Sequence, residues 1–168
     1  MIHTIDVALS QLGVAEATGK NDGIPAERYM RGDKLAWCAG FVLYCNEVSD
    51  DPCLFDRNGD GVIDRGDLKL WYSLRSVAAL LKRAQELGIF VDAAEPPVPN
   101  DLIFFGNTTS DVGVRGNHVG IVEAYDPVTD RISSIEGNYS NRVSRVVQRR
   151  GTRQISGFGR ISLLSEKT

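Results

Sequence analysis

The sequence has little of what several protein classes need. It contains three cysteines and two histidines in 168 residues. An odd number of cysteines is a poor disulfide framework, and the absence of a Cys-x-x-Cys pair argues against a zinc site. No apolar run approaches the roughly 18 residues that cross a bilayer, so we expect no membrane insertion. The start of the chain lacks a charged segment followed by an apolar block, so we expect no signal peptide.

The rest of the composition is that of a globular protein. Hydrophobic residues make up 42% and charged residues 24% of the chain, which excludes disorder, collagen-like repeats and a coiled coil. The formal net charge of −3 argues against a nucleic-acid-binding protein. The length suits one core. We therefore expect a single domain over residues 1–168 that binds no nucleic acid and is a monomer.

The hydrophobic pattern changes along the chain. Apolar residues at helical spacing predict helices over 2–16, about 37–48 and about 67–87. After the turn-rich segment 96–100, short runs typical of strands follow at 102–105, 118–125, 131–136, 145–149 and 156–162. A hairpin turn is expected at Asp126. N-terminal helices that pack on a C-terminal antiparallel sheet form an α+β fold.

Charge is unevenly distributed. Seven acidic residues and two arginines lie between Glu47 and Asp67, whereas six arginines and no acidic residue lie between Asn141 and Arg160. Solvated strand faces explain the arginines in one interpretation. In the other, they form a surface that meets an anionic polymer.

Residues 56–67 (DRNGDGVIDRGD) match the twelve-residue EF-hand calcium loop. The expected oxygen ligands are Asp56, Asn58, Asp60, the Val62 carbonyl, Asp64 and Asp67. Gly61 occupies the turn position, and Ile63 is expected to pack inward. The twelfth residue is Asp67 rather than glutamate, and this shorter side chain reaches less easily for bidentate binding. The segment resembles a single dockerin repeat, where a dockerin has two, so we interpret residues 50–70 as an inserted structural or regulatory calcium loop.

Cys38 stands at the start of the apolar helix expected at 37–48. Unpaired N–H groups and the helix dipole favour the nucleophilic thiolate at such a position. Taken alone, a buried structural thiol remains the alternative. Cys45 lies two turns further along and is interpreted as core, and Cys53 lies in a loop.

His118 opens the strand expected at 118–125, and Glu136 ends the next one. If these strands form a hairpin, their open ends lie together, and His118 lies beside Glu136 and Asn138. A helix-start cysteine, a strand-start histidine and a polar residue on the next strand follow the order of papain-like thiol hydrolases. His3, on the first helix, has no such neighbours.

Four segments together resemble the CHAP family, the cysteine, histidine-dependent amidohydrolases/peptidases. They are Trp-Cys-Ala-x-Phe-Val (37–42), PPVPNDLIFF (96–105), Asn-His-Val-Gly-Ile-Val (117–122) and Ile-Glu-Gly-Asn (135–138). The lead-in over 13–30 is also similar to that of small bacterial and phage members. The resemblance spans about residues 2–161, apart from the calcium loop.

This resemblance implies a papain-like (CHAP/NlpC-type) fold that cuts an amide bond of bacterial peptidoglycan. By the same resemblance, Cys38 is the nucleophile, His118 the base, Glu136 the group that orients the imidazole, and Asn138 a further polar residue. No cofactor is needed for this chemistry, so calcium is expected to be structural or regulatory. Further residues that could line the cleft are Asp22, Tyr29, Trp37, Asn117 and Tyr139, although core packing is the simpler expectation for Tyr29 and Trp37.

Several questions stay open at this point. A phage endolysin stored in the cytoplasm and a secreted antibacterial effector both fit, as does a fragment of a tail protein. A calcium-dependent wall-binding module without activity is one alternative function. A papain-like deamidase or transferase toxin that acts on a protein is another. The bond that is cut could join sugar to peptide, or lie within the stem or the cross-bridge.

Overall fold

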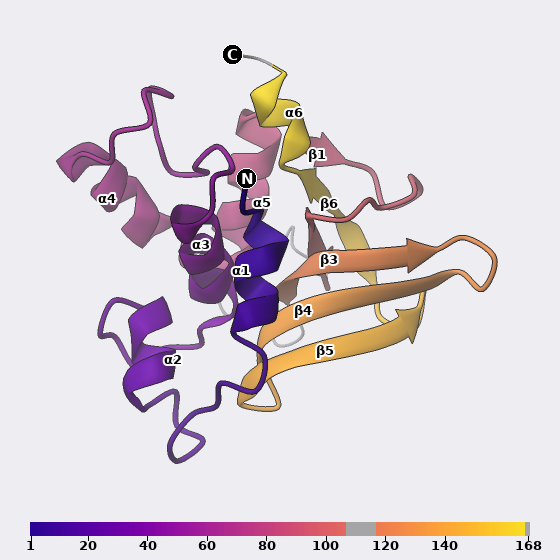
Figure 1. Cartoon of the computed structure of the whole chain (residues 1–168), viewed down its shortest axis with the longest axis horizontal. Helices are drawn as coiled ribbons and strands as arrows, with labels where there is room; N and C mark the ends of the chain where they lie inside the picture. The colour runs from indigo at the N-terminus through magenta and orange to yellow at the C-terminus, as the bar shows by residue number, and fades with distance from the viewer. Residues whose placement is uncertain (107–116, 167–168) are drawn as a thin grey trace.

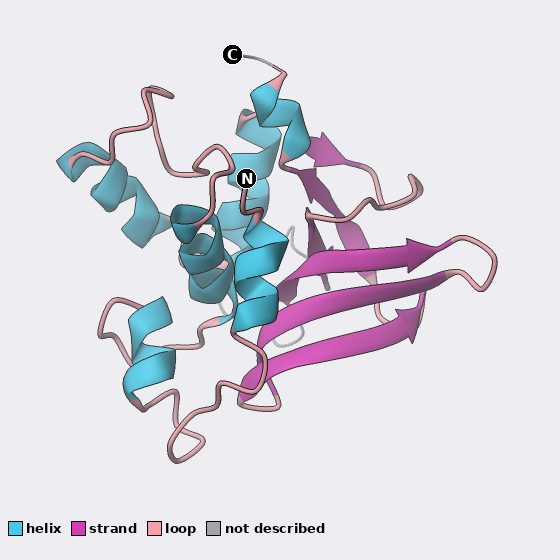
Figure 2. Cartoon of the chain, viewed as in Figure 1, coloured by secondary structure: helices cyan, strands magenta, loops and turns pink. Residues whose placement is uncertain are grey.

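The computed structural model describes residues 1–106 and 117–166, which form a helical layer and one antiparallel sheet (Figures 1 and 2). The helices are α1 (Thr4–Ser10), α2 (Ile24–Tyr29), α3 (Cys38–Val48), α4 (Arg65–Ser73), α5 (Val77–Glu86) and α6 (Ser162–Ser165). The strands are β1 (Phe90–Val91), β2 (Asp101–Phe105), β3 (His118–Asp126), β4 (Arg131–Tyr139), β5 (Arg142–Arg149) and β6 (Ile155–Arg160). The α+β class is therefore confirmed.

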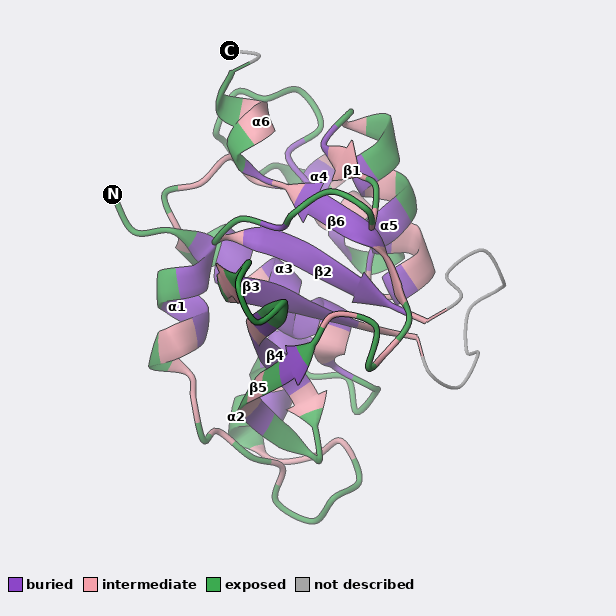
Figure 3. Cartoon of the chain, turned by 90° about the vertical axis from the view of Figure 1, so that its right-hand side faces the viewer, coloured by how far each residue is buried: buried purple, intermediate pink, exposed green. Residues whose placement is uncertain are grey.

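The six strands lie in the order β1-β6-β2-β3-β4-β5, and each neighbouring pair is antiparallel. The expected hairpin between β3 and β4 is present, with Ile121 opposite Ile135. On the other side of β3, His118 lies opposite Phe105 of β2. The central strand β2 is buried along its whole length (Figure 3). The start of β3 and the end of β4 therefore lie together at one end of these interior strands.

Helix α3 joins the helical layer to this sheet, and it packs against α1, β3 and β4. Its side chains Phe41 and Val42 are fully buried. Helix α3 approaches β4 closely at Gly137, where an added Cβ would lie 2.5 Å from Phe41 Cβ. The missing side chain thus lets the strand that carries Glu136 pack directly on the helix that begins at Cys38.

The helical part differs from the sequence expectation in three places. The first helix ends at Ser10 because the chain then turns at Gly13 (φ 86°), whose N–H donates to Val143 O of β5. The single helix expected at 67–87 is two helices, and the Ser76 hydroxyl caps the second by accepting from Ala79 N. Helix α2 was not expected. No helix in the described part of the chain is long and apolar enough to cross a membrane.

Candidate active site

Cys38 is the first residue of α3, as expected, and its side chain is half-buried. The turn before it is fixed by Trp37, whose fully buried ring stacks on Tyr29 at a centroid distance of 5.3 Å. Trp37 Nε1 donates to Glu16 Oε1 at 2.7 Å. The first helical hydrogen bond runs from Phe41 N to Trp37 O, so the N–H groups of the first turn have no partner within the helix. Cys38 therefore stands at a well-packed helix start whose first backbone donors are not used by the helix itself.

The other two thiols lie in less reactive surroundings. All three cysteines are free. Cys45 is fully buried within α3, and burial raises the pKa of its thiol well above the ordinary value. Burial also raises the pKa of Cys53, to about 11. Both thiols therefore stay protonated at neutral pH, which agrees with the interpretation of Cys45 as a core residue.

His118 and Glu136 meet at the open end of the β3–β4 hairpin, as the sequence predicts. His118 Nε2 lies 3.0 Å from Glu136 Oε2. The contact is close but poorly aligned as a hydrogen bond, so we treat it as an ion pair of the protonated ring. Cys38 is also near enough to the imidazole to raise its pKa. Since Nε2 faces the carboxylate, Nδ1 is the ring nitrogen left for the thiol.

The environment of His118 strongly favours the imidazolium. Burial on its own lowers the pKa of the ring, because a charged group is poorly solvated there. The contacts with Cys38 and Glu136 outweigh burial and raise the pKa to about 9. At neutral pH the ring is therefore protonated and flanked by two groups that can carry negative charge.

Glu136 is fully buried, yet its carboxyl group is ionised. Burial raises its pKa, but contacts with His118, Arg153 and Ser134 bring the pKa below the usual value. The space that Glu136 occupies depends on Gly120, where an added Cβ would lie 2.7 Å from Glu136 Cγ. Arg153, which also contacts the Glu136 carboxylate, is a neighbour of the site that the sequence pattern does not indicate.

Asn138 lies at an irregular point of β4. Its backbone has φ 59°, and the register between β4 and β5 shifts between Glu136 and Tyr139. In the amide orientation that satisfies its neighbours, Asn138 donates to Glu16 Oε1 at 3.1 Å and accepts from Trp37 N at 3.3 Å. It therefore braces the turn before Cys38, while its position beside His118 stays a prediction.

The other residues considered for the cleft lie in different surroundings. Tyr29 and Trp37 are buried and belong to the core. Asp22 accepts hydrogen bonds from Thr18 in its own loop. Tyr139 is 38% exposed, and its ring centroid lies 6.4 Å from that of His118, so it stands next to the candidate site. Asn117 immediately precedes His118 in the chain.

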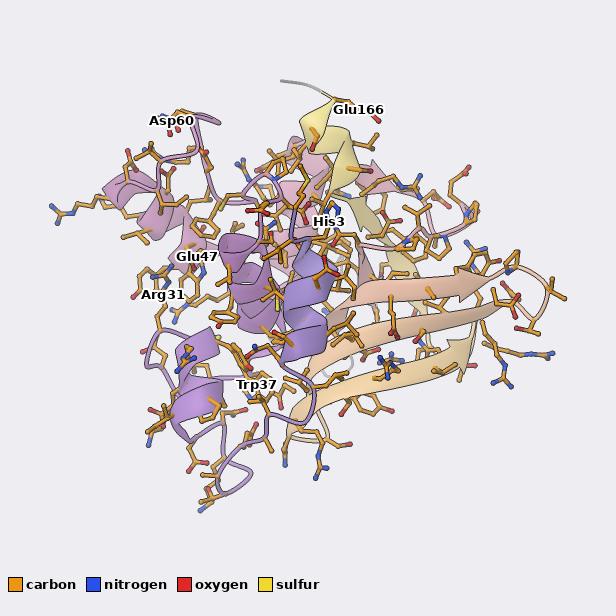
Figure 4. The ribbon with its side chains drawn as sticks, in the orientation of Figure 1. His3, Arg31, Trp37, Glu47, Asp60 and Glu166 are labelled. Carbon is orange, nitrogen blue, oxygen red and sulfur yellow. The ribbon has the colours of Figure 1, made fainter. Side chains whose placement is uncertain are left out.

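The loop at 56–67 has some features of a calcium loop. Asp56 accepts from the N–H groups of Asn58, Gly59 and Gly61, which wraps the chain around its carboxylate. Asp64 caps α4 and forms a capping box with Asp67. Figure 4 shows Asp60 well separated from Trp37, the neighbour of Cys38.

The carboxylates of this loop do not converge. Arg57 donates from N and Nε to Asp67 Oδ1, at 2.9 and 3.1 Å, and Asp64 N donates to the other oxygen. Backbone hydrogen bonds from Asp64 and Arg57 lower the pKa of Asp67 to about 2. Ile63, expected to pack inward, is 37% exposed. Within the described residues, no group of three or more His, Cys, Asp or Glu side chains is arranged to hold a metal ion.

A helix-start cysteine, a strand-start histidine and an antiparallel sheet place the chain in the papain-like α+β class. The model of the CHAP domain family matches residues 30–138, well over half of the chain. The chain therefore belongs to the CHAP domain family, whose members are amidases or peptidases. No curated protein and no solved structure matched the chain.

Proposed function

We propose that this protein is a peptidoglycan hydrolase that uses Cys38 as its nucleophile, His118 as general acid and base, and Glu136 as the group that orients the imidazole. The proposal is carried by the contact of His118 with Glu136 and by the effect of Cys38 on the pKa of the imidazole, all inside the range matched by the family. The helix start, the strand start and the next strand each supply one of the three side chains.

The proposed reaction has two halves. The Cys38 thiolate attacks an amide carbonyl, a C–S bond forms, and the carbonyl oxygen becomes an oxyanion near the backbone N–H of Cys38. The imidazolium of His118 then gives its proton to the departing amine, and the C–N bond breaks to leave a thioester. Neutral His118 next takes a proton from water, and the hydroxide attacks the thioester and releases the thiolate and a carboxylic acid.

The raised pKa of His118 suits the first half of this reaction. With a pKa of about 9, the ring holds the proton that the leaving amine needs at neutral pH. Glu136 stabilises this charged form, and because it is buried, water does not screen it. Lysis of the host at the end of a phage infection would use this chemistry, and so would attack on a wall by an antibacterial effector.

The arginine-rich strands contribute less free charge than their sequence suggests. Arg145 forms an ion pair with Glu123, Arg153 with Glu136, and Arg160 with Asp101. Other arginines of this region, such as Arg142 and Arg149, are exposed. They remain available to contact an anionic wall polymer.

Calcium binding to residues 56–67 is a separate proposal. Asp56, Asp60 and Asp64 supply the oxygen atoms that Ca²⁺ prefers. In the arrangement described, Asp67 is engaged by Arg57 and by a backbone N–H. Binding would require Asp67 to exchange Arg57 for the cation. No catalytic step is routed through the metal.

Digestion of purified peptidoglycan tests the proposed function. We expect soluble fragments whose masses identify the bond that is cut, whether between sugar and peptide, within the stem or in the cross-bridge. Binding to peptidoglycan without release of fragments would instead favour a wall-binding module. Neither binding nor release would favour a deamidase or transferase that acts on a protein.

A further inference from the structure

A second group of contacts surrounds the Glu136 carboxylate. Arg153, in the turn between β5 and β6, donates from Nη1 to Glu136 Oε2 at 3.0 Å and from Nη2 to Oε1. The Ser134 hydroxyl donates to Oε1 at 2.7 Å. Glu136 is fully buried, whereas the Arg153 side chain is 27% exposed. The carboxylate that faces His118 is thus also held by a planar fork of two donors.

Arg153 is itself held in place on two sides. Its Nε donates to Gln148 Oε1 at 2.8 Å. The guanidinium carbon lies 3.6 Å from the ring centroid of Phe105 and 5.5 Å from that of Tyr139. The Phe105 ring also stacks on that of His118, at a centroid distance of 6.3 Å and an interplanar angle of 29°. The guanidinium is therefore fixed by β2, β4 and β5 together, which is more than an ion pair on a surface requires.

We propose that Arg153 is a positioning residue that acts on His118 through Glu136: it fixes the carboxylate against the imidazole and offsets part of its negative charge. This inference rests on the proposed function, because the position of the imidazole affects a rate only if His118 is the general acid and base.

The sign of the effect on His118 follows from the charges around the ring. The groups that face it are Cys38 from α3, Glu136 and Tyr139 from β4, and the apolar Phe105 from β2. Removing the positive charge of Arg153 leaves Glu136 with the imidazolium as its one cationic partner among the contacts described. Loss of a nearby cation raises the proton affinity of the remaining groups. The titration of His118 must therefore move to higher pH when Arg153 becomes neutral.

The experiment follows the imidazole protons of His118 by NMR as a function of pH. His118 and His3 are the two histidines of the chain, so His3→Gln assigns both signals, and His3 serves as an internal reference. The variants are Arg153→Met and Arg153→Lys. The matched control is Arg145→Met, which removes an arginine with two contacts to the carboxylate of Glu123 on the same sheet.

We expect the His118 titration in Arg153→Met to move up by about one pH unit, with little change in Arg145→Met. Arg153→Lys keeps the charge but loses the fork, so the titration should move less. Solubilisation of purified peptidoglycan should slow about tenfold in Arg153→Met and by less in Arg153→Lys, since both misplace the carboxylate.

An unchanged His118 titration in a folded Arg153→Met protein would overturn the inference, whatever its activity. If Arg153→Met does not fold, Arg153→Lys decides: a slower rate supports the inference, and a wild-type rate with a wild-type titration overturns it. The NMR measurement needs no substrate. If His118 shifts as expected but the wild-type protein releases no peptidoglycan fragments, the proposed function fails while the effect of Arg153 on His118 stands.

Discussion

The raised pKa of His118 makes the stability of the fold depend on pH. The pKa is about 9 in the folded protein, compared with an ordinary value of 6.5. Because the folded state binds the proton more tightly, the stabilisation is fully present below pH 6.5 and is lost as pH rises through 9. A difference of this size corresponds to about 3 kcal/mol of unfolding free energy. The His118 side chain is only 18% exposed, so solvent screens little of this amount.

Urea unfolding between pH 6 and pH 10 measures the effect, as the difference between the wild-type protein and His118→Gln. We expect the wild-type advantage to shrink by about 3 kcal/mol across this range. His3→Gln is the matched control: Asp51 raises the pKa of His3 as well, but the His3 side chain is 49% exposed, so its effect on stability should be smaller. Cys38→Ser should reduce the pH dependence, because it removes one of the groups that raise the pKa of His118.

A wild-type advantage that stays constant from pH 6 to pH 10 would refute the assignment of a raised pKa to His118. An advantage that grows with pH would mean that the ring is neutral in the folded state, and that burial outweighs the contacts with Cys38 and Glu136.

Three further outcomes are expected. Gly137→Ala should lower the unfolding free energy by about 1–3 kcal/mol in urea titrations, because the added Cβ would meet α3 at 2.5 Å, whereas Gly159→Ala, with contacts at 3.4 Å, should change it by less. Glu136→Gln should keep part of the hydrolytic rate, since a neutral amide still orients the ring; a complete loss would show that the charge is required. Ca²⁺ should raise the melting temperature more than Mg²⁺ does, by the equivalent of about 2.7 kcal/mol at a hundredfold excess over Kd, and Asp56→Ala with Asp60→Ala should abolish the difference. Identical melting curves in EDTA and in millimolar Ca²⁺ would show that the loop binds no calcium.

The core of the candidate site could be predicted because its geometry depends on local features. An apolar run sets the start of α3 and therefore the position of Cys38. A tight turn at Asp126 sets the hairpin, and the hairpin brings His118 beside Glu136. Each step uses residues that are close in sequence, where hydrophobic period and turn chemistry are informative.

The remaining parts depend on contacts between distant segments. Arg153 reaches Glu136 from another turn of the sheet, seventeen residues further along the chain, and nothing in its spacing indicates this contact. Asn138 braces the turn before Cys38 through Glu16 and Trp37, which lie far earlier in the chain. In the loop at 56–67, Arg57 stands at a position that the ligand pattern leaves free, and its guanidinium engages Asp67.

The central claim is that Cys38 performs the chemistry. The most direct test compares the release of soluble fragments from purified peptidoglycan by the wild-type protein, Cys38→Ala and Cys45→Ala. We expect Cys38→Ala to fold normally and to lose nearly all activity. Cys45→Ala should lower stability, because it empties buried space, but retain the rate of the folded fraction. Substantial release of fragments by Cys38→Ala would contradict the account.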